Sequence, residues 1–417
     1  MRFAFTPIIA AVTLHALAGE KLDERNDLTT VHFGGPSSVQ NQVDSDTEKK
    51  APLFLLEDVI GQQTYYDFKE SIKRDSGIAF GLDYNVLYQY ANPSDSESNA
   101  LGGVFRLYGS WEPPGISATH PGSLVFKLEH RHNLGSYITP KQLANELGYA
   151  GLTAVPFSDA GMLLTNLYWM QNFNNNNFSF AVGQVDTTDY VDIYGLVNLW
   201  IDFNNLAFTT NPTIPVPDQG LGAAVRWTIK NNYYVLAGFA DANGDPEKPL
   251  DSFASFFDER EYFKHIEFGW AGSWEQHLVD NIHLTLWQID ERTQTDVPCG
   301  WGTAFSFSRE LGKWIPFLRA GYNDGGGAIL DRSISTGFGY SPNRKDDRLA
   351  LGLQWGQPNS EIYSTAGDDQ YTIETYYRLQ ILKHLQIVPD VQLLFNPAFN
   401  PSENRVWVFS LRARLAF

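Results

Sequence analysis

Cysteine and methionine are almost absent from this chain of 417 residues, which has one cysteine and three methionines. The single cysteine, Cys299, cannot form an internal disulfide bond, and we assign it no role. Past the amino terminus, no stretch of about 18 uncharged apolar residues occurs, which excludes a helical membrane protein. Basic residues are outnumbered, 30 Lys and Arg against 48 Asp and Glu, for a formal net charge of -18. Without a basic tract, such a chain is not expected to bind nucleic acid.

What the sequence does have is aromatic residues, 14 % of the total, and a regular alternation of apolar and polar side chains. The final stretch, 406–417 (VWVFSLRARLAF), shows this alternation most clearly. A period of two places Trp407, Phe409, Leu411, Ala413, Leu415 and Phe417 on one face of a β-strand, and the residues between them on the other. One face is apolar, while the other carries Arg412 and Arg414. This pattern predicts a wall between lipid and a wet lumen.

Alternating segments of roughly ten residues recur from Ser76 onward, separated by turn residues, as a transmembrane barrel requires. We predict sixteen strands, at 76–91, 102–113, 122–132, 161–173, 177–187, 218–229, 231–242, 259–273, 279–290, 301–310, 313–323, 332–341, 346–356, 369–380, 383–395 and 404–417. The predicted fold class is therefore all-β: an antiparallel up-and-down transmembrane β-barrel over 76–417. A mean hydropathy of -0.27 is compatible with it, because every second strand residue faces water.

The connections alternate between short and long. Tight turns are expected at 174–176, 231–232, 312–313 and 383–384, and long loops at 133–160, 188–217 and 243–258. This asymmetry of the two rims is typical of outer-membrane barrels, with both termini in the periplasm. Within the first long loop, 140–149 (PKQLANELGY) predicts a helix that could fold into the mouth of the barrel and narrow it.

The amino terminus predicts export. Arg2, the apolar stretch 3–17 and the small residues at 16–18 (ALA) match a secretory signal peptide over 1–18. A membrane anchor is the alternative, but the apolar run is short and His15 interrupts it. The polar segment 19–52 predicts a flexible leader, and 53–74 a short amphipathic helix or two, so that leader and helix span 19–75.

Apolar neighbours determine which strand residues face the lumen. Because Leu124, Phe126 and Leu128 point outward, the residues between them point inward, and the same reasoning applies to the other strands. The expected solute-contacting lumen residues are Arg106, Lys127, Glu129, Arg131, Arg226, Glu267, Arg319, Glu374, Arg378, Asp390, Arg412 and Arg414, with Asp83 also facing inward. Such a mixture of Arg, carboxylate, Tyr and amide suits a neutral polyhydroxylated solute, since a ring of one sign would select ions. Equally, these charges could pair across strands and brace the wall.

Several stretches resemble the carbohydrate-selective porins of Gram-negative outer membranes, the OprB family, over roughly residues 66 to 417. The clearest are GIAFGLDYNVLYQY (77–90), GSLVFKLEHRH (122–132), VGQVDTTDYVDIYG (182–195), PFLRAGY (316–322), ETYYRLQI (374–381) and VPDVQLLFNPAFNP (388–401). The resemblance implies a sixteen-stranded barrel that passes sugars by diffusion, with lumen arginines at a constriction. Its carry-over candidates are Arg106, Lys127, Glu129, Arg319, Glu374 and Arg378. The leader at 19–52 and the acidic loops depart from the family.

The sequence gives weaker support for metal binding, calcium binding or glycoside hydrolysis. Glu129, His130 and His132 would make an awkward metal site on a strand, because the two histidines share one face and Glu129 takes the other, so histidines at the membrane interface or rim are the better interpretation. The segment 241–245 (DANGD) starts like a calcium loop but has Ser252 where the closing Glu belongs. The carboxylates of Asp186, Asp189 and Asp192 could serve a glycosidase, but no partner motif fixes an acid and a nucleophile.

The sequence thus predicts an outer-membrane porin and not an enzyme. We expect this porin to need no cofactor and to pass small sugars into the periplasm. Its expected partners are outer-membrane lipid, the permeating sugars and the barrel-assembly machinery. The last is expected because the terminal Phe417 resembles the assembly signal of bacterial outer-membrane barrels. A homotrimer is a further expectation. A general or ion-preferring porin and a secreted carbohydrate-binding or carbohydrate-degrading β-protein remain as alternatives.

Overall fold

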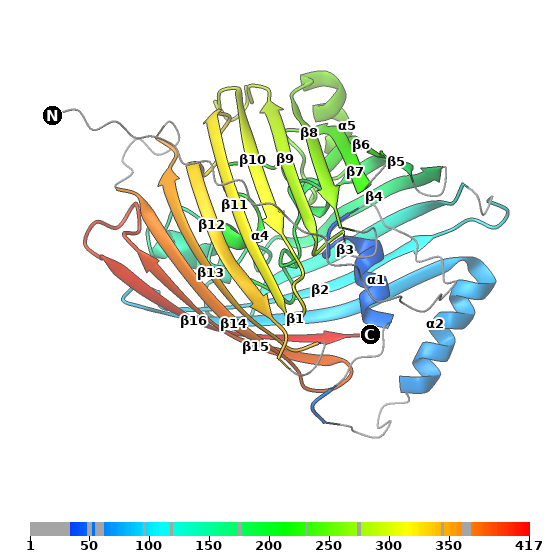
Figure 1. Cartoon of the computed structure of the whole chain (residues 1–417), viewed down its shortest axis with the longest axis horizontal. Helices are drawn as coiled ribbons and strands as arrows, with labels where there is room; N and C mark the ends of the chain where they lie inside the picture. Colours follow the sequence, from blue (N-terminus) through cyan, green and yellow to red (C-terminus); the bar gives the residue numbers. More distant parts are fainter. Residues whose placement is uncertain are drawn as a thin grey trace, which may run out of the picture. The chain divides into compact units, whose positions relative to one another are not determined.

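A computed structural model of the chain describes residues 34–47, 52–54, 62–94, 97–116, 120–173, 177–229, 232–272, 277–342, 346–360 and 368–417. The expected signal peptide at 1–18 lies outside these ranges, as do most of the leader, residues 55–61 of the expected helical segment, and the turn residues 174–176 and 231. The described part is built around a single closed sheet (Figure 1).

The described residues form sixteen strands in one antiparallel barrel, each paired with its neighbours in sequence and β1 with β16. This confirms the predicted fold class. The strands are β1 (Ile78–Asn92), β2 (Asn99–Trp111), β3 (Gly122–Asn133), β4 (Gly161–Phe173), β5 (Phe178–Val185), β6 (Gly220–Thr228), β7 (Tyr233–Asp241), β8 (Tyr262–Ala271), β9 (Asn281–Ile289), β10 (Gly300–Ser308), β11 (Trp314–Gly325), β12 (Leu330–Tyr340), β13 (Arg348–Pro358), β14 (Gln370–Gln380), β15 (Leu385–Phe395) and β16 (Arg405–Ala416).

The two ends of the barrel differ as predicted. At the end that holds the carboxyl terminus, which we call the turn rim, connections are short, as at 309–313 and 381–384. At the opposite end, the loop rim, the connections 134–160, 186–219 and 242–261 are long. The second of these, 186–219, turns back into the barrel and is called the inner loop below.

The outer face of the barrel is apolar. In β16, the exposed fractions of Phe409 and Leu411 are 45 % and 50 %, whereas those of Arg412 and Arg414 are 0 % and 3 %. The same alternation places Phe105, Leu318 and other apolar residues outside. An apolar exterior around a polar interior is the arrangement of a barrel in lipid. Of the helices in the described ranges, none is long and apolar enough to cross a membrane.

Helices occupy few residues. They are α1 (Val39–Thr47), α2 (Gln62–Ser76), α3 (Pro140–Glu146), α4 (Leu206–Thr209), α5 (Asp251–Ala254), the 3₁₀ turn η1 (Thr187–Asp189) and the π-helical turn η3 (Ser255–Glu259). Helix α3 confirms the helix predicted in the first long loop. It begins at Pro140, a residue suited to a first helical position, and the Gln142 side chain accepts a hydrogen bond from the Thr139 N–H at 3.0 Å.

Helix α1 corrects one sequence expectation. We predicted a flexible leader over 19–52, but residues 39–47 form a helix inside the barrel that contacts β1, β2 and β3 (Figure 1). Val39 and Val43, four residues apart and therefore on one helix face, are buried against inward-facing residues of the strands. Because Val39 and Val43 are the only apolar residues of this helix, its mostly polar sequence did not predict a buried helix.

Candidate functional site

The inner loop fills the middle of the barrel and is anchored first by aromatic packing. Tyr194 and Phe203 contact the inward-facing ring of Phe317 on β11, with ring centroids 5.1 and 6.0 Å away. Phe203 also packs edge-on against Tyr376 of β14, at 5.0 Å. These buried contacts make the inner loop a fixed part of the lumen that narrows the path through the barrel.

Two wall arginines donate hydrogen bonds to the backbone of the inner loop. Arg319 of β11 donates to the carbonyl oxygens of Phe208 and Thr210, at 3.3 and 2.9 Å. Arg412 of β16 donates to the Leu199 carbonyl at 3.0 Å and to the Asn204 side chain at 2.7 Å. A guanidinium has five N–H donors in a rigid fork, so one side chain can satisfy several loop acceptors.

A further anchor is centred on Asp202. Its carboxylate accepts from the Tyr376 hydroxyl at 2.7 Å and lies 3.2 and 3.4 Å from guanidinium nitrogens of Arg378 and Arg348. Next to it, Glu374 accepts from the backbone N–H groups of Asn204 and Asn205, at 2.6 and 3.1 Å. Strands β13 and β14 therefore hold the tip of the inner loop by charge.

Asp192 is the corresponding anchor at the start of the loop. Its backbone, in the left-handed region at φ 52°, donates to Glu267 at 3.1 Å, and its carboxylate pairs with Arg319 and, at 2.9 Å, with His283. Burial would raise the pKa of Asp192, but the cationic Arg319 and the His283 hydrogen bond outweigh burial and lower the pKa below its usual range. Asp192 therefore holds its place in the lumen as a carboxylate.

These anchors change the interpretation of the predicted lumen residues. The inward facing of Arg319, Arg378, Arg412, Glu267 and Glu374 is confirmed, and each of these side chains makes at least one hydrogen bond to the inner loop. Glu267 also accepts from Tyr234 of β7 and Thr285 of β9, and Arg378 also donates to the Asp346 carbonyl. Alternation within a strand shows which way a side chain points, not what fills the space in front of it. Many of these charges thus brace a loop, which the sequence did not suggest. The expected pairing between strands also occurs, since Asp83 of β1 pairs with Arg106 of β2 and Arg414 of β16, while contact with a solute stays a prediction.

On the loop-rim side of the inner loop lies a cavity, here called the outer cavity. From β3 it is lined by three predicted residues, Lys127, Glu129 and Arg131, and from the inner loop by Asp186, Asp189 and Trp200. The Lys127 ammonium lies 3.5 Å from Asp189 and 3.7 Å from Asp186, and Arg131 pairs with Glu129 at 2.6 Å. Charged donors and acceptors therefore alternate around this cavity.

Asp189, which lines the outer cavity, has a carboxyl group whose pKa is raised far above its usual value. Burial raises the pKa of Asp189 to about 7; Lys127 opposes this rise, while the nearby Asp186 adds to it. Near neutral pH, the carboxyl group is thus divided between its protonated and ionised forms. It can act both as a hydrogen-bond donor and as an acceptor toward a hydroxylated solute.

Trp200 lies next to a line of alternating charges that runs along the barrel wall over the adjacent strands β16, β1 and β2. The guanidinium of Arg106 lies over the Trp200 ring, 3.7 Å from its centre, and donates to Asp83 at 2.8 Å. Asp83 also accepts from Arg414 at 2.8 Å, and Arg414 pairs with Asp46 of α1 at 3.0 and 2.8 Å. This set, Asp46, Arg414, Asp83 and Arg106, is called the charge chain below.

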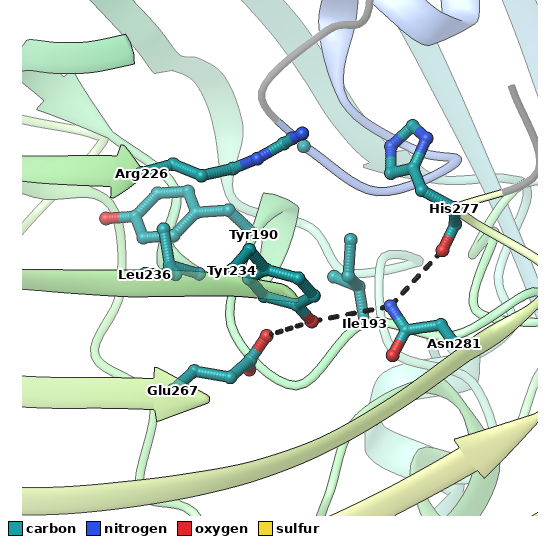
Figure 2. A pocket seen from close by; sticks show the side chains of 9 residues that line it. Tyr190, Ile193, Arg226, Tyr234, Leu236, Glu267, His277 and Asn281 are labelled. Atoms are coloured by element: carbon teal, nitrogen blue, oxygen red, sulfur yellow. Dashed lines mark hydrogen bonds between the residues drawn. The ribbon is translucent and has the colours of Figure 1, made fainter. Parts of the chain in front are cut away.

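A smaller cavity, the inner cavity, lies against β6 to β9 and is lined by Arg226, another predicted residue. Figure 2 shows the Tyr234 hydroxyl between Glu267 and Asn281, to which it is joined by hydrogen bonds of 2.8 and 3.4 Å. Asp390, the last of the predicted set, is buried in the wall and accepts from Gln392 at 3.3 Å.

Comparison with known proteins decides the family. The family model described as "Carbohydrate-selective porin, OprB family" matches residues 126–297 and 300–417. The chain belongs to the OprB family. Porin AaxA of Chlamydia abortus is 21 % identical over 369 residues, spanning 83 % of this chain and 79 % of that porin, and Porin AaxA of Chlamydia felis is 23 % identical over 371 residues with the same coverage. The Pseudomonas putida OprB structure at high pH superposes with a TM-score of 0.65 at 13 % identity, covering 88 % of this chain and 99 % of that one.

Porins of this family and fold are channels, so the carboxylates of the inner loop need another role than the glycosidase chemistry weighed above. Asp186, Asp189 and Asp192 are spaced three apart in the sequence, and all three face the lumen cations Lys127 or Arg319. The sequence analysis gave no role to these residues, to Asp202, to Trp200 or to Asp46. For the inner-loop residues the one sequence signal was the length of the connection between β5 and β6, since a loop of that length has to fold somewhere, and Asp46 had no such signal.

The other motifs behave as their alternation predicts. His130 and His132 share the outer face of β3, with their Nδ1 atoms 3.2 Å apart, away from Glu129. The backbone N–H of Asn243 donates to Asp241 at 3.0 Å, as in a turn. Within the ranges that the structure describes, no group of three or more His, Cys, Asp or Glu side chains is arranged to hold a metal ion.

Proposed function

We propose that this OprB-family porin passes small sugars by passive diffusion. The observation that carries the proposal is the lining of the outer cavity, which contains as many acidic as basic side chains. The basic ones are Lys127, Arg131, Lys141 and Arg292, and the acidic ones are Glu129, Asp186, Asp189 and Asp218. An ion-selective pore presents a surplus of one sign to its solute. A balanced lining offers no such surplus, but it offers many hydrogen-bond donors and acceptors to a neutral polyol.

Weak and reversible contacts are what such a channel needs, because the solute has to leave again. The gradient supplies the driving force, so that no cofactor is required. Trp200 adds an aromatic surface to the same cavity, against which the apolar face of a sugar ring can pack. The description of the family as carbohydrate-selective supports this assignment.

The proposal includes the location and the partners. We place the barrel in a Gram-negative outer membrane, exported through a signal peptide at 1–18, with its apolar face in lipid. Phe417 would be recognised by the barrel-assembly machinery before closure, and the barrels would associate as homotrimers. The apolar exterior of the closed barrel and the alternation of short and long connections support the membrane location.

Conductance of the detergent-purified protein in a planar bilayer tests the function, with glucose, maltose and sorbitol added in turn. We expect current steps that close saturably with a sugar, with lower affinity for the open-chain polyol. Steps that no sugar closes would contradict sugar selectivity and indicate a general or ion-preferring porin. A protein that stays soluble without detergent and never inserts would instead indicate a secreted β-protein.

A matched pair of variants connects this test to the outer cavity. Arg131→Gln removes a cation from the cavity lining, so the sugar affinity should fall. Arg405→Gln removes a cation from the outer side of β16 and should leave the affinity unchanged. Equal affinities in the two variants would argue against the outer cavity as the sugar site.

A further inference from the structure

The outer and inner cavities are separated by a thin partition made of two chain segments. Ser37 and Asp189 line the outer cavity, whereas Gly34 and Tyr190 line the inner one. The two segments are joined where the Gly35 N–H donates to the Asp189 carbonyl at 2.6 Å. One half of the partition belongs to the anchored inner loop, and the other half leads directly into α1.

The segment 34–47, which we call the plug segment, takes no part in the sheet. Its two buried valines pack on the wall, and Gln40 donates to Ser123 at 3.3 Å. Asp46 ties its end to the charge chain through Arg414 and the Tyr108 hydroxyl. A helix of nine residues is not stable by itself in water, so α1 depends on these contacts.

The barrel does not depend on the plug segment in the same way. Its sixteen strands are hydrogen-bonded in a closed ring, and the inner loop is held by Arg319, Arg412 and Asp202, none of which bonds to residues 34–47 in the described contacts. Withdrawal of the segment would therefore leave a complete channel.

We propose that residues 34–47 form a displaceable plug, and that its withdrawal joins the two cavities into one open path. The inference rests on the proposal that the barrel is a diffusion channel. With the plug in place, the partition at Gly34–Ser37 closes the path on the turn-rim side of the outer cavity. With the plug withdrawn, Arg226, Tyr234 and Asn281 of the inner cavity become contacts for the solute on its way out (Figure 2).

A disulfide across the partition tests this proposal. A Cβ atom built at Gly35 lies 3.2 Å from the Cβ atom of Ile193 in the inner loop. Disulfides join Cβ atoms about 3.5–4.5 Å apart, so the pair needs to move by only a few tenths of an ångström. The variant is Gly35→Cys with Ile193→Cys in a Cys299→Ser background, and the matched control is Gly35→Cys alone in that background. Conductance in plain potassium chloride is measured before and after reduction with dithiothreitol.

We expect the oxidised pair to remain at a low conductance level and the reduced pair to reach a higher one. The control should not respond to dithiothreitol. Deletion of 34–47, with barrel formation checked by the heat-dependent shift of the band on a gel, should stay at the higher level. Equal conductance of the oxidised and reduced pair would overturn the displaceable plug, whether or not the deletion variant folds.

Other outcomes of these measurements would contradict the proposed function and leave the plug intact, or contradict both proposals. If the reduced pair or the deletion variant conducts but no sugar closes the current, the plug stands and sugar selectivity does not. If the deletion variant conducts and the reduced pair remains closed, the pore stands and displacement is wrong. If neither the folded deletion variant nor the reduced pair conducts, both proposals are wrong.

Discussion

Arg106 lies over Trp200, with its guanidinium carbon 3.7 Å from the ring centre, so that one face of the indole is covered by a cation. Such a contact is worth about 0.5–2 kcal/mol, more when it is desolvated, as it is here. It holds an inner-loop aromatic residue at the edge of the outer cavity.

Replacing Trp200 with Leu should raise the single-channel conductance and weaken sugar affinity several-fold, because the cavity widens and loses its aromatic surface. Current steps and their block by maltose are the measurement. Trp227→Leu is the matched control, since this residue is exposed on the outer face of β6 and should change neither quantity. Trp200→Leu channels with unaltered conductance and block would show that Trp200 does not border the sugar path.

Asp189 should make ion selectivity depend on pH. Its pKa of about 7 means that it is neutral below that pH and ionised above it. Below it, the outer cavity has four basic and three acidic side chains that are charged, and above it four of each. The reversal potential in a potassium chloride gradient should therefore shift toward anion preference as the pH falls through about 7.

The Asp189→Asn variant is the control for this titration. It should show the anion preference of the acidic form at every pH, without the step near pH 7. A step that persists in Asp189→Asn would assign the titration to another group.

Replacing Arg319 with Ala should destabilise the protein and release the inner loop. Both Arg319 and Asp192 are buried, and removal of one partner from a buried ion pair costs about 3–5 kcal/mol. We expect a lower unfolding temperature in detergent, a noisier current and a weaker sugar block, since the loop shapes the outer cavity. Arg332→Ala, at an exposed arginine of β12, should behave as the wild type. A quiet and thermally unchanged Arg319→Ala channel would contradict the role of Arg319 as an anchor.

Leu411→Arg tests the lipid face. Arginine on the lipid side of a barrel strand costs about 2–4 kcal/mol near the midplane of the bilayer. The free energy of unfolding, measured by urea titration in lipid vesicles, should fall by this amount. Leu250→Arg, at a residue that is 80 % exposed in a connection at the loop rim, should be close to neutral. Equal stability of both variants would mean that Leu411 does not face lipid.

Most of the barrel could be predicted from the sequence because a strand records its environment locally. Period-two alternation located all sixteen strands and the facing of residues such as Leu411 and Arg412, each from its immediate neighbours. The short and long connections followed from turn residues in the same way. Helix α3 was also predictable, since Pro140 and Gln142 mark its start within a few residues of each other.

The path of the inner loop could not be predicted, because it is determined by contacts between distant segments. Nothing near Asp202 indicates that Arg378 and Arg348 will face it, 176 and 146 residues further along. The same holds for Asp46 and Arg414, 368 residues apart. Lumen charges identified by alternation were therefore expected either to contact a solute or to pair across strands, whereas many of them bond to the inner loop and α1.

The charge chain places two aspartates and two arginines in one buried line, which sums to zero. Loss of Asp83 takes from Arg106 the carboxylate to which it donates, and loss of Arg414 takes from Asp46 its guanidinium partner, whereas loss of Asp46 or Arg106 leaves the remaining members bonded but with one unbalanced charge. Positions 46, 83, 106 and 414 lie on four different elements, yet the charge at each position depends on the charges at the others. An exchange that keeps the line neutral has to alter two of them at once, one of each sign.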